Sequence, residues 1–194
     1  MVKRNTLISF RASIIGNIVA RFIEGLASDP FPVIQLGGTV LTVESVDVAI
    51  MKFDEIIGEA GEAVRLDFHT PVRFSVAGSK KRRKPKFRLF PIPEHVFHSL
   101  MDHWNTYAGA ENRIRKGFAE WVINEAVEVD YRLRPITLHA TRSRIFRGSV
   151  GYIIYRFHDP KYLDTAAKLL QYGTYMNVGT GRSIGLGVMT YRKA

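Results

Sequence analysis

After residue 63, segments with the period of a strand and segments with the period of a helix follow one another in an order that few folds accommodate. Four stretches alternate apolar and polar residues, and three repeat apolar residues every three to four positions. The order is strand, two helices, two strands, helix and strand, over residues 64–76, 94–108, 113–126, 127–143, 146–157, a helix from 159, and 188–192. With one helix inserted, this is the β-α-β-β-α-β order of a ferredoxin-like domain, so we expect an α+β protein.

The first 63 residues favour half of a second unit of the same kind. Residues 5–12 alternate loosely and predict a strand, and residues 13–26 carry apolar side chains at helical spacing. Residues 39–50 are rich in valine and threonine and predict a further strand. The predicted organisation is therefore a partial β-α-β unit over 1–63 and a complete ferredoxin-like domain over 64–194.

Positive charge gathers in the second predicted domain. The chain has 194 residues, with 28 Lys and Arg against 18 Asp and Glu. Residues 1–63 hold five basic and eight acidic residues, a balance of −3, whereas residues 64–194 hold 23 and ten, a balance of +13. This asymmetry indicates a domain that meets a polyanion, and a nucleic acid is the partner we expect. A soluble surface that happens to be basic, or a ribosomal or membrane-surface protein, is the alternative.

Composition excludes several other classes of protein. The content of 46% hydrophobic and 24% charged residues is that of a globular chain. The absence of cysteine excludes disulfides and thiolate metal sites and is compatible with a cytoplasmic location. The longest apolar stretches are interrupted well before the roughly 20 residues of a membrane span, and the basic N-terminus does not lead into a signal peptide. No pattern of metal ligands occurs, so we expect no metal and no cofactor.

Two basic segments are the first candidates for contacts with a polyanion. Residues 80–88 include seven Lys and Arg, and residues 142–147 form a second basic turn in which Phe146 could stack on an unpaired base. Arg132 and Arg134 alternate on one face of a predicted strand, as a sheet that receives RNA would require. A solvated surface is the competing interpretation of each. The candidate contacts are Lys80, Lys81, Arg82, Arg83, Lys84, Lys86, Arg142, Arg144 and Arg147.

A glycine-rich loop separates the last predicted helix from the last predicted strand. Residues 172–187 contain five glycines and one arginine, a composition that lets backbone amides approach a ligand and form an anion site. The loop enters a strand and lacks the spacing of a dinucleotide fingerprint or a P-loop. A simple turn before an edge strand is the alternative. Its candidate contacts are Gly179, Gly181, Arg182, Ser183, Gly185 and Gly187.

This loop resembles the C-terminal glycine-rich signature of the repeat-associated RAMP superfamily. Gly179-x-Gly181 followed by Arg-Ser-Ile-Gly-Leu-Gly, just before the terminal strand, is most similar to the Cas6-type family of CRISPR RNA-processing endoribonucleases. Residues 66–72, 93–107 and 147–152 agree with that family in order and spacing. The resemblance covers about residues 5–194, and the loop is its most specific part.

The resemblance implies tandem ferredoxin-like domains and binding of precursor CRISPR RNA. It also implies a metal-independent cut in the repeat, in which the 2′-hydroxyl attacks the adjacent phosphorus, and retention of the product RNA by many members. Partners would then be CRISPR repeat RNA and, through an exposed sheet edge, a second copy or other CRISPR-associated subunits.

The catalytic residues stay unassigned at this stage. Members of the family usually have a complete first domain, where the catalytic histidine commonly sits, whereas this sequence predicts only half of one. The natural chain could be longer, the chain could be a short variant, or a partner could supply the missing elements. A non-catalytic RNA-binding subunit is therefore the main alternative, and a small nucleotide-binding enzyme is a third. The six histidines are His69, His95, His98, His103, His139 and His158.

Overall fold

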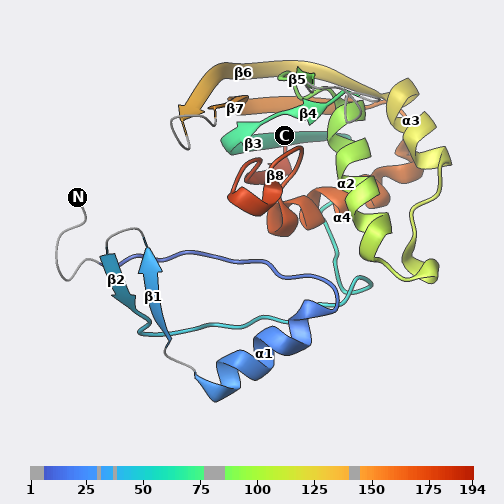
Figure 1. Ribbon diagram of the computed structural model, residues 1–194. Helices are drawn as coiled ribbons and strands as arrows, with labels where there is room; N and C mark the ends of the chain where they lie inside the picture. The colour runs from blue at the N-terminus through green and yellow to red at the C-terminus, as the bar shows by residue number, and fades with distance from the viewer. Residues whose placement is uncertain (1–6, 30–31, 37–38, 77–85, 140–144) are drawn as a thin grey trace. The chain divides into compact units, whose positions relative to one another are not determined.

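The computed structural model describes residues 7–29, 32–36, 39–76, 86–139 and 145–194. The chain divides into two compact units, Met1–Ile50 and Met51–Ala194, which are taken separately below (Figure 1). The second unit therefore includes residues 51–62, which the sequence groups with the first. Within it, the Phe53 ring packs edge-on against Trp104 at 4.8 Å, and the Glu59 amide donates to the Tyr191 hydroxyl at 2.7 Å.

The first unit consists of helix α1 (Ile18–Ser28) followed by an antiparallel hairpin of β1 (Val33–Leu36) and β2 (Thr39–Thr42). Its α-β-β order differs from the predicted β-α-β order. Residues 7–12 are not in a strand, and the strand predicted over 39–50 ends at Thr42. A strand persists only where a neighbour accepts its backbone hydrogen bonds, and β1 offers four paired positions.

The second unit is built on a four-stranded antiparallel sheet. Its strands are β3 (Ala63–Val72), β6 (Ala126–His139), β7 (Ile145–Phe157) and β8 (Met189–Lys193), in the order β6-β7-β3-β8 (Figure 1). Strands β3 and β6 flank β7, which pairs antiparallel with both. This is the split β-α-β arrangement of the ferredoxin-like fold, and it confirms the predicted fold class.

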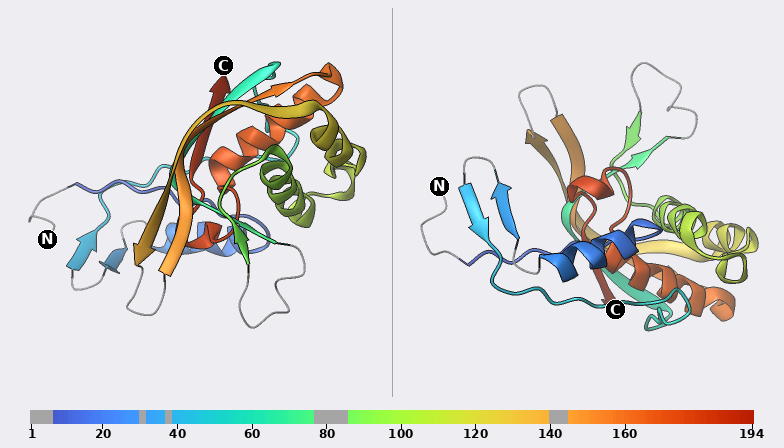
Figure 2. Two further views of the ribbon diagram at one scale, coloured as in Figure 1. Left: turned by 90° about the horizontal axis from the view of Figure 1, so that it is seen from above. Right: turned by 60° about the horizontal axis from the view of Figure 1, so that its bottom comes forward.

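Helices α2 (Pro93–Tyr107), α3 (Gly117–Glu125) and α4 (Leu163–Met176) cover one face of the sheet, and no helix among the described residues of this unit covers the other face (Figures 1 and 2). Alternation in β3 explains the burial, because Val64, Leu66 and Phe68 are buried while the residues between them are not. Aromatic rings fill the layer between sheet and helices. The largest fully buried side chains there are Trp104, Tyr155, Tyr172, Phe97 and Phe118.

Two elements differ in extent from the sequence prediction. Helix α3 begins at Gly117 and not at Arg113, because Asn105 of α2 binds both the amide (2.8 Å) and the carbonyl (2.9 Å) of Ile114 and holds that segment extended. The strand predicted over 64–76 is broken at Arg73. Its remainder, β4 (Phe74–Ser75), pairs with β5 (Phe87–Arg88) as a hairpin.

Short 3₁₀ turns complete the unit at Ala110–Asn112 (η2), Pro160–Tyr162 (η3) and Arg182–Ile184 (η4). Among the residues that the structure describes, no helix is long and apolar enough to cross a membrane.

Candidate nucleic-acid interface

The glycine-rich loop between α4 and β8 depends on left-handed backbone. Four of its glycines have positive φ, with values of 78°, 94°, 79° and 71° at Gly179, Gly181, Gly185 and Gly187. Asn177 at the end of α4 also has a positive φ of 60°. Glycine adopts these angles without the steric penalty that a Cβ imposes, so the loop reverses direction repeatedly within a few residues.

The space around each of these glycines shows whether the packing of the loop requires a glycine at that position. A Cβ on Gly187 would lie 1.8 Å from the Val178 carbonyl oxygen, and one on Gly179 would lie 2.5 Å from the Arg73 carbonyl oxygen. A Cβ on Gly185 would meet nothing within 4 Å among the described residues. Gly179 and Gly187 are therefore required by the packing of the loop itself, whereas the surface at Gly185 is open to a ligand.

The loop docks onto the end of β3 and the residues after it. The Ser75 and Thr180 hydroxyl oxygens lie 3.1 Å apart. Three loop and strand amides donate to residues 70–73: Gly187 to the Pro71 carbonyl (3.1 Å), Thr180 to the Arg73 carbonyl (2.8 Å) and Val188 to the Thr70 hydroxyl (2.9 Å). The Thr-Pro segment and the glycine-rich loop, which lie more than 100 residues apart in sequence, thus form one structural feature.

Arg182 fastens the loop to helix α2. Its Nη2 donates to the Ser99 hydroxyl at 2.6 Å and to the Ser99 carbonyl, and its Nε donates to the Gly179 carbonyl at 3.2 Å. The Ser99 hydroxyl also accepts the Gly179 amide at 2.9 Å. Burial lowers the pKa of Arg182 to about 10, so the guanidinium remains protonated at neutral pH.

This arrangement can attract an anion. Arg182 Nη1 is buried with no hydrogen-bond partner within the described part of the chain. The amides of Gly181, Arg182 and Ser183 likewise have no acceptor among the described residues, and Ser183 is exposed. The fixed positive charge of Arg182 and the three unpaired amides of the same loop favour a phosphate group at the loop surface.

Beside Arg182, a histidine and a tyrosine form a partly buried pair. His103 Nδ1 lies 2.7 Å from the Tyr172 hydroxyl, which burial keeps neutral by raising its pKa. Burial, and secondarily the positive charge of Arg182, lower the pKa of His103 to about 4. The ring is therefore neutral at physiological pH and bonded to Tyr172.

This pair predicts a loss of stability in weak acid. Below the ordinary histidine pKa near 6.5, the unfolded chain gains a proton that folded His103 takes up only near pH 4, so stability falls between these values. The expected contribution is about 1 kcal/mol, reduced because the ring is half exposed. Urea denaturation at pH 7.5 and 5.0 measures it. In His103→Gln the fall over this pH range should be smaller by that amount, and an identical fall would contradict the assignment.

The other histidines lie elsewhere. His95 stacks on Phe74 with ring centroids 5.6 Å apart, exposed His98 contacts Asp102 at 3.0 Å, and His69 Nε2 lies 2.9 Å from the Thr190 hydroxyl. His139 and His158 are exposed. No group of three or more acidic or histidine side chains within the described ranges is placed to hold a metal ion.

Arg73 joins the loop to two hairpins. Its guanidinium carbon lies 3.9 Å from the centroid of the Phe87 ring on β5 and 5.0 Å from that of Phe146 on β7. Its carbonyl accepts the Thr180 amide of the loop, as described above. Arg73 is not among the candidate contacts predicted from the sequence. The available signal was an arginine between Val72 and Phe74, two residues after Pro71.

The sequence-derived candidates fall into three groups. The loop residues are brought together with Arg73, although Arg182 is turned inward. Lys86, directly before β5, and Arg147, in β7 opposite Thr137, are exposed, while Phe146 lies near Arg73. The remaining candidates lie outside the described residues: Lys80, Lys81, Arg82, Arg83, Lys84, Arg142 and Arg144.

A ferredoxin-like sheet with a glycine-rich loop folded back onto its first strand defines the RAMP class of proteins. The family model described as CRISPR-associated endoribonuclease Cas6 matches residues 66–189. The chain belongs to this family.

Solved structures agree on the fold. The product complex of a Thermus thermophilus Cas6 (TTHB231) superposes with a TM-score of 0.74 at 18% identity, over 91% of this chain and 71% of that one. The product complex of a second Cas6, TTHA0078, gives 0.71 at 19% identity, over 92% of this chain and 74% of that one. Comparison with curated protein sequences gives no match. Between a quarter and a third of each solved chain thus has no counterpart here.

Proposed function

We propose that this protein binds the repeat of precursor CRISPR RNA and cleaves it. The observation that carries the proposal is the convergence on Arg73 of the glycine-rich loop and the two hairpins, β4–β5 and β6–β7. The family supports the substrate class, and two solved structures of the same fold are Cas6 product complexes.

The proposed RNA contacts divide by role. Ser183 and the open surface at Gly185 receive a phosphate, with the buried charge of Arg182 beneath it. Gly179, Gly181 and Gly187 maintain the shape of that surface. The flanking cations follow the RNA backbone without reading bases: Lys80, Lys81, Arg82, Arg83, Lys84, Lys86, Arg142, Arg144 and Arg147.

The proposed reaction is attack of a 2′-hydroxyl on the adjacent phosphorus, which leaves a 2′,3′-cyclic phosphate and a free 5′-hydroxyl. It needs a base for the attacking hydroxyl, an acid for the leaving oxygen and cations for the charge on phosphorus. The buried Arg182 and the loop amides can stabilise the negative charge on phosphorus. No side chain of this chain is assigned as the base or as the acid.

A second candidate function is RNA binding without cleavage, as a RAMP-type subunit of a CRISPR effector complex. It is favoured by the inward bonding of His103 to Tyr172, which occupies this histidine in a contact within the protein. In this role the RNA footprint would be the same and the protein would assemble with other subunits.

Incubation of the protein with repeat-containing RNA in EDTA tests both functions. The expected result is binding and a cut that leaves a 2′,3′-cyclic phosphate, at the same rate with and without EDTA. The matched control is the same RNA with a 2′-deoxy nucleotide at the cut, which should bind equally and remain intact. Binding without any cut selects the non-catalytic function, and absence of binding at low salt refutes both.

A further inference from the structure

The two hairpins of the second unit lie in different sheets. Strands β4 and β5 pair with each other, whereas β6 and β7 belong to the four-stranded sheet. In both views of Figure 2 the hairpins extend to the same side of the unit. No backbone hydrogen bond joins one hairpin to the other within the described ranges. Side-chain contacts must therefore set the distance between them.

Arg73 stands where the chain passes from one sheet to the other, as the one residue between β3 and β4. Its backbone is held in place, because its carbonyl accepts the Thr180 amide of the glycine-rich loop at 2.8 Å. From this fixed point the side chain reaches a ring on each hairpin. The guanidinium carbon lies 3.9 Å from the ring centroid of Phe87 and 5.0 Å from that of Phe146. One guanidinium thus connects both hairpins to the end of β3.

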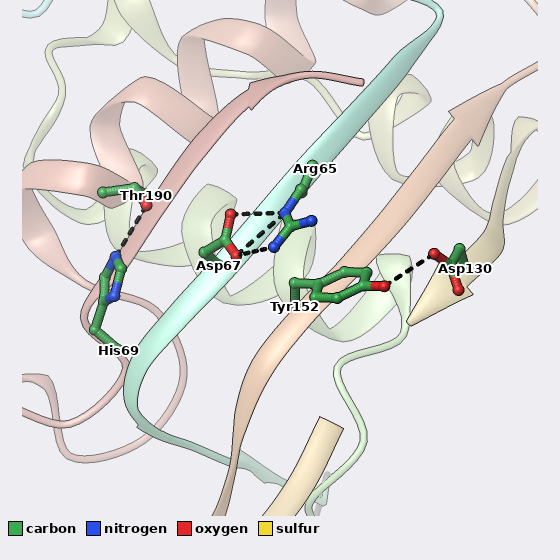
Figure 3. Close-up of polar contacts among 6 residues, drawn as sticks. All are labelled: Arg65, Asp67, His69, Asp130, Tyr152 and Thr190. Atoms are coloured by element: carbon green, nitrogen blue, oxygen red, sulfur yellow. Dashed lines mark hydrogen bonds and ion pairs between the residues drawn. The ribbon is translucent and has the colours of Figure 1, made fainter. Parts of the chain in front are cut away.

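Another stacked arginine of this unit is held in a different way. The guanidinium carbon of Arg65 lies 3.8 Å from the centroid of the Tyr152 ring. Arg65 also donates to the Asp67 carboxylate through Nε at 2.9 Å and Nη2 at 2.7 Å (Figure 3). The Arg73 side chain makes no hydrogen bond or ion pair with other described residues, and its Nε is buried without a partner. The two rings are therefore the contacts that hold the Arg73 guanidinium.

A further ring contact between the hairpins lies some distance away. Phe90, which follows β5, meets Tyr131 of β6 edge-on with ring centroids 5.1 Å apart. Tyr131 pairs with Ile153, which is roughly 20 Å from Phe146 along β7 at the usual rise of a strand. The Phe90–Tyr131 contact therefore leaves the part of the hairpin around Phe146 to Arg73.

Each ring that Arg73 contacts is next in sequence to an exposed cation. Lys86 precedes Phe87, and Arg147 follows Phe146. Neighbouring side chains of an extended segment point to opposite faces, so a ring turned toward Arg73 turns the adjacent cation outward. The position of Arg73 thus determines how far apart these two cations lie.

We propose that Arg73 is a positioning residue, which holds the two hairpins at a fixed separation so that their cations bind one RNA molecule together. The inference rests on the proposed function, since it concerns how the same RNA contacts are arranged. Two arms that are already in place lose less conformational freedom on binding than two independent arms. Arg73 therefore raises the affinity through the hairpins, without a phosphate contact of its own.

Spin-label distance measurements test the positioning without RNA. The chain has no cysteine, so Arg88→Cys in β5 and Thr137→Cys in β6, both exposed positions, each accept one nitroxide label. The distribution of label distances should be narrow and should broaden about twofold in Arg73→Met, because the ring contacts are lost. Arg65→Met, which removes an arginine stacked at a similar distance on Tyr152, is the matched control and should leave the distribution unchanged. An unchanged distribution in Arg73→Met would overturn the proposal.

Salt titrations with repeat RNA separate positioning from direct contact. Arg73→Met should weaken binding about tenfold at low salt with an unchanged salt slope. Lys86→Ala removes a proposed phosphate contact instead and should lower the slope by about 0.7 to 0.9. Arg73→Lys keeps the charge without the planar stacking group, so its affinity should be closer to that of Arg73→Met than to wild type. A slope lowered in Arg73→Met as much as in Lys86→Ala would show a phosphate contact and refute the positioning role.

Phe87→Leu guards against a folding defect at Arg73. It removes one of the two ring contacts and keeps an apolar side chain in β5. It should weaken repeat RNA about threefold to tenfold, and it should add no further loss when combined with Arg73→Met, because both changes break the same contact. Additive losses would contradict the link.

The two proposals fail separately. If the distance distribution broadens in Arg73→Met but the wild-type protein binds no repeat RNA, the proposed function is refuted while Arg73 still holds the hairpins. If the wild-type protein binds and cleaves the repeat and Arg73→Met does so with unchanged affinity, the positioning role alone is refuted.

Discussion

Gly187→Ala is expected to lower the free energy of unfolding by about 3 kcal/mol or more. The new methyl group would lie 1.8 Å from the Val178 carbonyl oxygen at a φ of 71°, so both the backbone and its neighbour must move. The shift would break the hydrogen bonds that the Gly187 and Val188 amides donate to Pro71 and Thr70. Urea denaturation followed by circular dichroism measures the loss, and repeat RNA binding should fall with it.

Gly185→Ala is the matched control for this substitution. Gly185 has a similar φ of 79°, yet an added Cβ meets nothing within 4 Å among the described residues. The expected cost is the backbone penalty alone, about 1 kcal/mol. Equal destabilisation by the two substitutions would show that the close contact with Val178 does not determine the loop.

Lys81→Ala/Arg82→Ala/Arg83→Ala is expected to reduce the affinity for repeat RNA about 100-fold at low salt. Three lost phosphate contacts should also lower the salt slope by about 2 to 3. Arg182 is left unchanged in this variant, because its removal would also break the bonds to Ser99 and Gly179 that shape the loop. Fluorescence titrations at several salt concentrations give both quantities.

A control variant removes the same amount of charge elsewhere. Arg113, Arg115 and Lys116 are exposed before α3, and their replacement by alanine lowers the net charge equally. If this control reduces the affinity and the salt slope as much as the first triple variant, binding depends on overall charge and the assignment of residues 80–88 is wrong.

The fold of the second unit could be predicted because its local patterns agree with its topology. Val64, Leu66 and Phe68 alternate and are buried, and Pro93 begins a helix at a position where a missing amide costs nothing. Once the four strands and the crossovers were identified, the ferredoxin-like order followed, since few arrangements pair strands this way.

The first unit was predicted less well for a physical reason. The valines of residues 43–50 favour a strand, but β propensity expresses packing against neighbouring strands. The described pairing of β1 with β2 runs only as far as Val33 opposite Thr42, and residues 43–50 pair with no strand among the described residues. Local composition cannot reveal which residues have a neighbouring strand to pair with.

The sequence predicts the glycine-rich loop and the basic segments as the candidate site, and the contacts that join them are seen only in the structure. The glycines of the loop are visible in the sequence, and so are the cations of the two hairpins. The bonds of Arg182 to Ser99 and the stacking of Arg73 between Phe87 and Phe146 join residues far apart in the chain. Side chains that pair only in the folded state leave no periodic signal, so an exposed ligand contact and a buried anchor look the same.

The position of β8 beside β3 has a consequence for how the chain is made. Val64 pairs with Lys193, so a central strand of the sheet gains its second neighbour from a segment that is synthesised well over 100 residues later. Such long-range pairing slows folding, and until it forms, the edge of β3 can pair with other chains. The nascent protein therefore carries an open, aggregation-prone strand until β8 has been made, and a truncation before Met189 would make that state permanent.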